Sequence, residues 1–138
     1  MRWISRNIHR LMILSGVLTL SMVYAVIAPE AALQSTFGSS VGNGPVADLV
    51  VRNWGALIGL IGAMLIYASG KPELRPLALT VAGASKAIFV VLVFANGGRF
   101  LSHQAGIAAI VDLLWVVIFA AYVVTVRPVE PASVASAR

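Results

Sequence analysis

Four long apolar stretches, separated by short polar segments, dominate the hydrophobic pattern of this chain. They cover residues 11–28, 49–69, 77–95 and 107–126, and each is near the roughly 20 residues that an α-helix needs to cross a bilayer. None shows the strict alternation of a β-strand, and four segments are too few for a closed transmembrane barrel. The pattern therefore predicts an all-α protein, an integral membrane four-helix bundle, with residues 1–127 forming one domain.

Composition supports the membrane assignment and narrows the chemistry. Hydrophobic residues make up 59% of the 138 positions and charged residues only 11%, which leaves too apolar a surface for a soluble globular protein. The absence of cysteine excludes disulfides, thiolate metal sites, iron–sulfur clusters and covalently attached haem. The net charge of +5 does not indicate nucleic acid as a partner, because the basic residues are scattered beside apolar stretches and do not form a patch with aromatic residues.

The positive charges outside the apolar stretches indicate an orientation. One side of the predicted membrane carries Arg2, Arg6, Arg10, Lys71, Arg75, Arg127 and Arg138. Only Arg99 lies in a loop on the other side. Because cytoplasmic loops carry the excess of Lys and Arg, the sequence predicts an up-down-up-down topology with both termini in the cytoplasm.

The segments that flank the first and last stretches allow further predictions. The first stretch resembles a secretory signal peptide, with basic residues before it and the small residue Ala28 at its end. Pro29 directly after Ala28 disfavours cleavage there, so we expect a retained helix, with cleavage as the alternative. The tail at residues 128–138 is rich in Ala, Ser and Pro and has little to bury, so we expect it to be disordered.

The segment after Pro29 reads PEAALQSTFG. Leu33 and Phe37 lie one helical turn apart in it, on what would be the apolar side of a brief interfacial helix. Gly38 would end that helix. The alternative is an irregular loop.

Small residues also recur at helical spacing in the second and third stretches. Gly55, Gly59 and Gly62 share one face of the second stretch, and Ala78 and Ala82 have a comparable spacing in the third. Small residues let two helix backbones approach closely. We therefore expect the second and third helices to pack through a shared groove, with association between chains as the alternative.

Three charges lie within the apolar stretches: Arg52, Lys86 and Asp112. Charges inside a membrane are costly, so they have partners or a function. From a rise of about 1.5 Å per helical residue, we expect all three to reach the outer half of the bundle. Asn53 and Trp115 could add hydrogen bonds beside them, so the residues give a candidate site of Arg52, Asn53, Lys86, Asp112 and Trp115.

Two hypotheses explain these charges. In the first, they form a structural lock: Asp112 pairs with Lys86 or Arg52, and the remaining cation pairs with Asp48 or reaches lipid headgroups. In the second, two buried cations against one buried anion leave a net positive pocket. Such a pocket would bind an acidic or carbonyl-bearing amphiphile, such as a fatty acid, an aromatic acid or a quinone head.

The sequence shows no catalytic signature, and we predict no cofactor and no metal. It contains no zinc-protease, nucleophile-elbow, phosphate-loop or dinucleotide-binding motif. His9 and His103 fall on opposite sides of the predicted membrane, so the pair cannot clamp one haem between helices. A single intramembrane carboxylate is too little for a proton relay. These observations favour a non-enzymatic protein.

Four segments resemble a known family: PEAALQSTFG, VVRNWGALIGLIGAMLIYA, GASKAIFVVLVF and DLLWVVIFAAY. Together they are similar to the BphX-like proteins of the wider DoxX-like four-helix group. The most distinctive element is RNWGAL at the start of the second stretch. The resemblance implies a small bacterial protein of the cytoplasmic (inner) membrane and supports Arg52, Trp54, Lys86 and Asp112 as site residues.

From the residues and the resemblance we expect a protein that binds an amphiphilic or anionic small molecule, or a partner subunit, through the charged cluster. Its partners would be membrane lipid, an amphiphile or quinone, and a second copy or another membrane protein. The resemblance also implies an alternative, an accessory subunit of a quinone-linked membrane oxidoreductase or of an aromatic-compound degradation system. A small transporter is a further alternative, which does not rest on the resemblance.

Overall fold

The computed structural model describes residues 2–40, 42, 44–96 and 98–125, and all regular structure in these residues is helical. The elements are α1 (Arg2–Leu20), the 3-10 helix η1 (Ser21–Val23), α2 (Tyr24–Ile27), α3 (Pro29–Phe37), α4 (Pro45–Ser69), α5 (Arg75–Ala95) and α6 (Gln104–Thr125). Four helical segments are long and apolar enough to cross a membrane: Trp3–Ile27, Pro45–Ser69, Arg75–Ala95 and Gln104–Thr125. The predictions of an all-α protein and of four such helices are confirmed. The expected disorder of residues 128–138 lies outside the described residues.

The helices extend beyond the apolar stretches because backbone hydrogen bonding does not depend on hydropathy. α4 begins at Pro45, before the apolar stretch starts at Leu49. Proline is favoured in the first turn, where its missing N–H has no helical partner in any case. Asp48 lies in the same turn, where a carboxylate interacts well with the positive end of the helix dipole.

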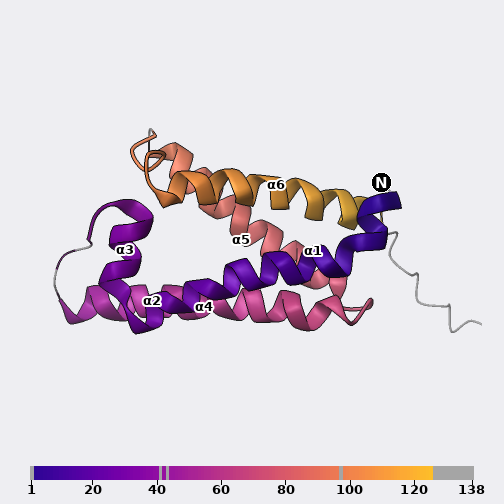
Figure 1. The fold of residues 1–138 in the computed structure, drawn as a ribbon, viewed down its shortest axis with the longest axis horizontal. Coiled ribbons are helices and arrows are strands. Elements are labelled where there is room, and N and C mark those ends of the chain that lie inside the picture. The colour runs from indigo at the N-terminus through magenta and orange to yellow at the C-terminus, as the bar shows by residue number, and fades with distance from the viewer. Residues whose placement is uncertain (1, 41, 43, 97, 126–138) are drawn as a thin grey trace, which may run out of the picture.

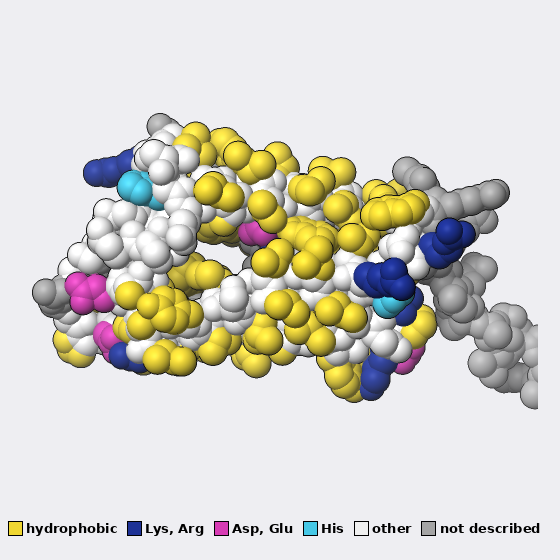
Figure 2. Space-filling model, viewed as in Figure 1, with side chains coloured by type: hydrophobic (Ala, Val, Ile, Leu, Met, Phe, Trp, Pro, Cys, Tyr) yellow, Lys and Arg dark blue, Asp and Glu magenta, His cyan; other side chains and the backbone are white. Residues whose placement is uncertain are grey.

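The outer surface of the bundle is apolar along its length. One large side chain from each long helical segment shows this: Val17, Leu57, Val91 and Leu114 are between 53% and 65% exposed. Hydrophobic side chains cover most of the face in Figure 2, whereas Lys and Arg gather mainly at the end where α1 begins. A continuous apolar surface of this extent suits lipid hydrocarbon as its surroundings.

The long helices form two layers (Figure 1). One layer contains α1 with its continuation through η1 and α2, packed on α4, and the other contains α5 packed on α6. We call the end where α1 begins the N-terminal end, and the opposite end, which carries α3, the α3 end. The two layers approach each other at the N-terminal end and diverge toward the α3 end.

Glycines of α4 bring the first layer together. A Cβ on Gly62 would lie 2.5 Å from the backbone nitrogen of Leu20 and 2.7 Å from the carbonyl oxygen of Gly16. A Cβ on Gly55 would lie 2.8 Å from Cβ of Ala25. The small-residue face of α4 therefore packs on the first span. The expectation that it packs on the third span is wrong, because the spacing of small residues does not specify which helix fills the groove.

At the N-terminal end the two layers share one hydrophobic core, which we call the N-terminal core. It draws on α1, α4, α5 and α6, and its buried members are Ile8, Met12, Leu65, Ala68, Ala78, Leu79, Ala82, Trp115, Phe119 and Tyr122. Phe119, Ile8, Met12, Leu65 and Leu79 are fully buried, and Trp115 and Tyr122 are at most 7% exposed. This core holds the layers at the end where they approach most closely.

At the α3 end the short helix α3 lies between the layers (Figure 1). It begins at Pro29, after Ala28 leaves the helical conformation with φ −129° and ψ 71°, as expected for a residue before proline. It ends at Gly38, whose φ of 68° suits glycine. The predicted short helix is confirmed.

Two apolar side chains of α3 hold it in place. Leu33 is buried with Ala25 and Val51. The ring of Phe37 lies 6.0 Å from that of Trp54 and 5.4 Å from that of Phe100, measured between centroids. α3 therefore connects the two layers where they are furthest apart.

Candidate functional site

Lys86 is a buried charge near the middle of α5, with 8% of its surface exposed. Its Nζ lies 2.5 Å from Oδ1 of Asp112 on α6. The same ammonium donates a hydrogen bond to Oγ1 of Thr19 on α1, at 3.1 Å. Lys86 therefore connects the two layers through one carboxylate and one hydroxyl.

Thr19 belongs to the buried face of α1, which also carries Ile8, Met12 and Ser15 at spacings of three and four residues. Ser15 is fully buried, and its Oγ has no hydrogen-bond partner among the described residues. We call Ser15, Thr19, Lys86 and Asp112 the polar layer. The two hydroxyls were not identified from the sequence, although two polar residues four positions apart in an apolar span are a recognisable signal.

The polar layer interrupts the hydrophobic core. On the N-terminal side of it lies the N-terminal core, which includes Trp115, one helical turn after Asp112. On the other side is a separate cluster formed by Val90, Val93, Ala105 and Ala109 of α5 and α6. The middle of an otherwise apolar bundle is an unfavourable environment for a charged side chain unless that side chain has a partner.

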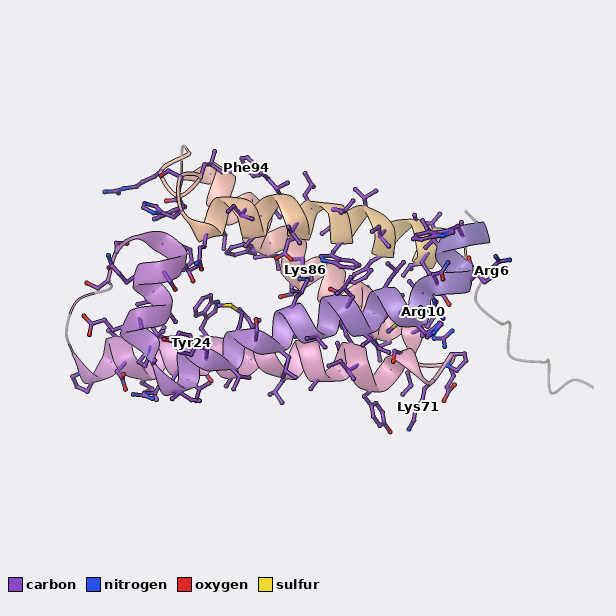
Figure 3. All side chains as sticks on the ribbon, in the orientation of Figure 1. Arg6, Arg10, Tyr24, Lys71, Lys86 and Phe94 are labelled. Atoms are coloured by element: carbon purple, nitrogen blue, oxygen red, sulfur yellow. The ribbon has the colours of Figure 1, made fainter. Side chains whose placement is uncertain are left out.

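The surface is hollowed beside this layer. Figure 2 shows an opening bounded by α3, α6 and the segment from α1 to α2. Figure 3 places Lys86 between the layers, and Oδ1 of Asp112 lies 2.5 Å from its Nζ.

The exposures of the two charged side chains agree with this arrangement. The side chain of Asp112 is 18% exposed and that of Lys86 is 10% exposed, so the carboxylate is the more accessible partner. Because the long helices run across the view in Figure 2, the opening faces the side of the bundle and neither of its ends. In a membrane this side is the lipid side.

Arg52 occupies a different place. Its Nε lies 2.7 Å from Oδ2 of Asp48, one turn earlier on α4. Its Nη1 donates to the carbonyl oxygen of Val26, a group at the end of α2 that the helix leaves unpaired. Arg52 therefore caps α2 and anchors it to α4.

This arrangement overturns the expectation of a net positive pocket. The side chain of Arg52 is 42% exposed and already paired with Asp48, so it adds no buried positive charge to the polar layer. Lys86 and Asp112 leave the layer electrically neutral. The pairing is the one that the structural hypothesis described, with Asp112 bound to Lys86 and the remaining cation bound to Asp48.

The other candidate residues are divided in the same way. Trp54, two residues after Arg52 on α4, packs on Phe37 of α3. Asn53, between them, is exposed. Trp115 is buried, and its ring centroid lies 5.7 Å from that of Phe119. The six candidates therefore form two groups. Arg52, Asn53 and Trp54 lie on α4, near its junction with α2 and α3. Lys86 and Asp112 form the ion pair of the polar layer, and Trp115 lies in the N-terminal core beside it.

The junction of α3 and α4 also carries grooves. One, of about 390 Å³, is lined by residues that include Pro29, Glu30, Leu33 and Asp48. A neighbouring one, of about 710 Å³, is lined by Ala28, Pro29, Glu30, Ala31, Gln34, Asp48 and Arg52. The acidic side chains there are exposed, and Asp48 is paired with Arg52.

Side chains of the types that bind metals are dispersed over the described residues. Within residues 2–40, 42, 44–96 and 98–125 no group of three or more His, Cys, Asp or Glu side chains could hold a metal ion. His9 lies on α1 and His103 directly before α6, and both are exposed. The chemistry that the polar layer offers is hydrogen bonding and charge pairing.

The fold and this site describe a helical bundle with four helices able to cross a membrane and one charged pair between its layers. Comparison of the chain with protein-family models, with curated proteins and with solved structures finds no match.

Proposed function

We propose that this protein spans the cytoplasmic membrane of a bacterium in an up-down-up-down topology, with both termini in the cytoplasm. The distribution of charge supports this orientation. Arg6, Arg10 and Lys71 all lie at the N-terminal end (Figure 3), and cytoplasmic ends carry the excess of basic residues. The resemblance to BphX-like proteins agrees with such a protein.

We further propose that the protein is a non-enzymatic binding protein for an amphiphilic molecule, which enters the hollow from the lipid. The observation that carries this proposal is a partly exposed carboxylate near the middle of a membrane helix: Asp112 is 18% exposed and is paired with Lys86, which lies between the two layers (Figure 3). The apolar part of the molecule would lie between the layers, and its polar head would meet the polar layer.

A purely structural lock fits this geometry less well. A buried ion pair is most stable when side chains seal it and hydrogen bonds satisfy its remaining polar atoms. Here the carboxylate is partly exposed, and no described residue donates a hydrogen bond to its Oδ2. Polar capacity that the protein does not use, beside an accessible space, is typical of a ligand site.

Lipid analysis of the purified protein tests this proposal. Wild-type protein is extracted from its native membrane in mild detergent, and the bound lipids and quinones are compared with those of the whole membrane by mass spectrometry. We expect one class of amphiphile to be enriched on the protein. We expect the enrichment to disappear in the combined variant Lys86→Met and Asp112→Leu, which removes both charges and keeps the side chains similar in size.

The variant Asp48→Asn is the matched control, because it removes a carboxylate that is paired with Arg52 away from the polar layer. It should keep the enrichment. Wild-type protein whose bound lipids match the composition of the membrane would refute the proposal, and so would unchanged enrichment in the combined variant.

A further inference from the structure

The ion pair leaves part of Asp112 unused. Lys86 reaches Oδ1, and no described residue donates a hydrogen bond to Oδ2. An ionised carboxylate has about four acceptor positions on its two oxygens. Asp112 is also the more exposed member of the pair, and its partner Lys86 lies between the two layers (Figure 3). The site therefore presents a hydrogen-bond acceptor to a molecule that enters from the lipid.

The charge of the layer limits which molecules fit. Lys86 and Asp112 together are neutral, and Arg52 is paired with Asp48. An anion beside Asp112 would face a like charge, and a cation would face the ammonium of Lys86. Either would also bring an uncompensated net charge to the middle of an apolar bundle, which is unfavourable. An uncharged head avoids both penalties.

We infer that the ligand of this site is an uncharged amphiphile with a hydroxyl group, and that this hydroxyl donates a hydrogen bond to Oδ2 of Asp112. The inference rests on the proposed function and specifies the ligand class. A head that carries only acceptors, such as an ester or a fully oxidised quinone, leaves Oδ2 without a donor. A hydrogen bond to a charged group is strong enough for the site to prefer a hydroxyl head over a head that carries only acceptors.

Trp115 allows this selection to be measured. It lies one turn from Asp112 in α6 and belongs to the N-terminal core beside the polar layer. Bromine atoms on an alkyl chain quench tryptophan fluorescence at short range. The other two tryptophans of the chain are replaced in a common background, Trp3→Phe and Trp54→Phe, so that the fluorescence reports on Trp115 alone.

The experiment compares three probes of the same chain length in vesicles that contain the reconstituted protein: a dibrominated octadecanol, the corresponding methyl ester and the corresponding fatty acid. We expect the alcohol to quench Trp115 at a mole fraction about tenfold or more below that of the ester, since a hydrogen bond to a charged group is worth at least this ratio. The combined variant Lys86→Met and Asp112→Leu should lose the preference, and Asp48→Asn should keep it.

The possible outcomes separate the inference from the proposed function. Equal quenching by alcohol and ester would show that amphiphiles enter without selection by Asp112, which overturns the inference and leaves the proposed function intact. A preference for the fatty acid, or an alcohol preference that persists in the combined variant, would also overturn the inference. Failure of all three probes to quench Trp115 more than in the combined variant would overturn both.

Discussion

The ion pair between Lys86 and Asp112 allows a sharp prediction about stability. Each single variant, Lys86→Met or Asp112→Leu, leaves one charge near the middle of the bundle without its partner. The Nζ to Oδ1 distance of 2.5 Å corresponds to an attraction of about 7 kcal/mol at an effective dielectric constant of about 20. The cost of removing both charges from water offsets most of that attraction.

From these opposing terms we expect each single variant to lose about 3–5 kcal/mol of unfolding free energy. The combined variant should lie within about 2 kcal/mol of the wild type, because an apolar pair needs no desolvation. The coupling free energy between the two sites should therefore be about 3 kcal/mol or more. Asp48→Asn should cost only about 0.5 kcal/mol, because Asp48 and Arg52 form an exposed pair one turn apart.

The assay is titration of the detergent-solubilised protein with sodium dodecyl sulfate, followed by tryptophan fluorescence, for the wild type, both single variants, the combined variant and Asp48→Asn. Single variants that are no less stable than the combined variant would refute the reasoning, because the two charges would then not depend on each other. An Asp48→Asn variant as unstable as Asp112→Leu would contradict the contrast between the two pairs.

Three further predictions follow from the packing and the charge distribution. Gly62→Ala should destabilise the protein by about 1–3 kcal/mol in the same titration, because the new methyl group meets backbone atoms of Leu20 and Gly16. Gly83→Ala is the control and should not destabilise the protein, because a Cβ there has its nearest neighbour 3.8 Å away. Phe37→Ala should speed hydrogen exchange of the α3 amides about ten- to a hundredfold, because two aromatic contacts that hold α3 are lost; unchanged exchange would contradict that role. In the cysteine-free chain, a membrane-impermeant maleimide should label Ser102→Cys and not Glu73→Cys in cells with an intact cytoplasmic membrane, and the reverse pattern would contradict cytoplasmic termini.

The role of Arg52 illustrates what a hydrophobic pattern cannot provide. Its place in an apolar stretch indicates a charge that needs partners, and the i, i+4 spacing correctly points to Asp48. Its second partner is the carbonyl of Val26. That contact forms because α2 ends shortly before Pro29 and because α4 packs against α2. Both are tertiary features, so the sequence alone overestimated the positive charge near Lys86.

The glycines of α4 show the same limit. Their spacing indicates a close helix contact, but it describes only one surface of that contact. The partner is α1 because Gly16 and Leu20 bring a backbone with the matching shape to that face. Helix order in the chain does not reveal this match.

The sequence by itself determined the helical class, the four apolar spans, the short helix after Pro29 and the need of the buried charges for partners. These properties follow from local hydropathy, proline and glycine geometry and the cost of charge in an apolar medium. Only the tertiary structure decided that Lys86 pairs with Asp112 and Thr19, that Arg52 lies elsewhere, and that a hollow opens beside the carboxylate. Those features depend on how two helical layers diverge, and that divergence is set by packing between residues far apart in the chain.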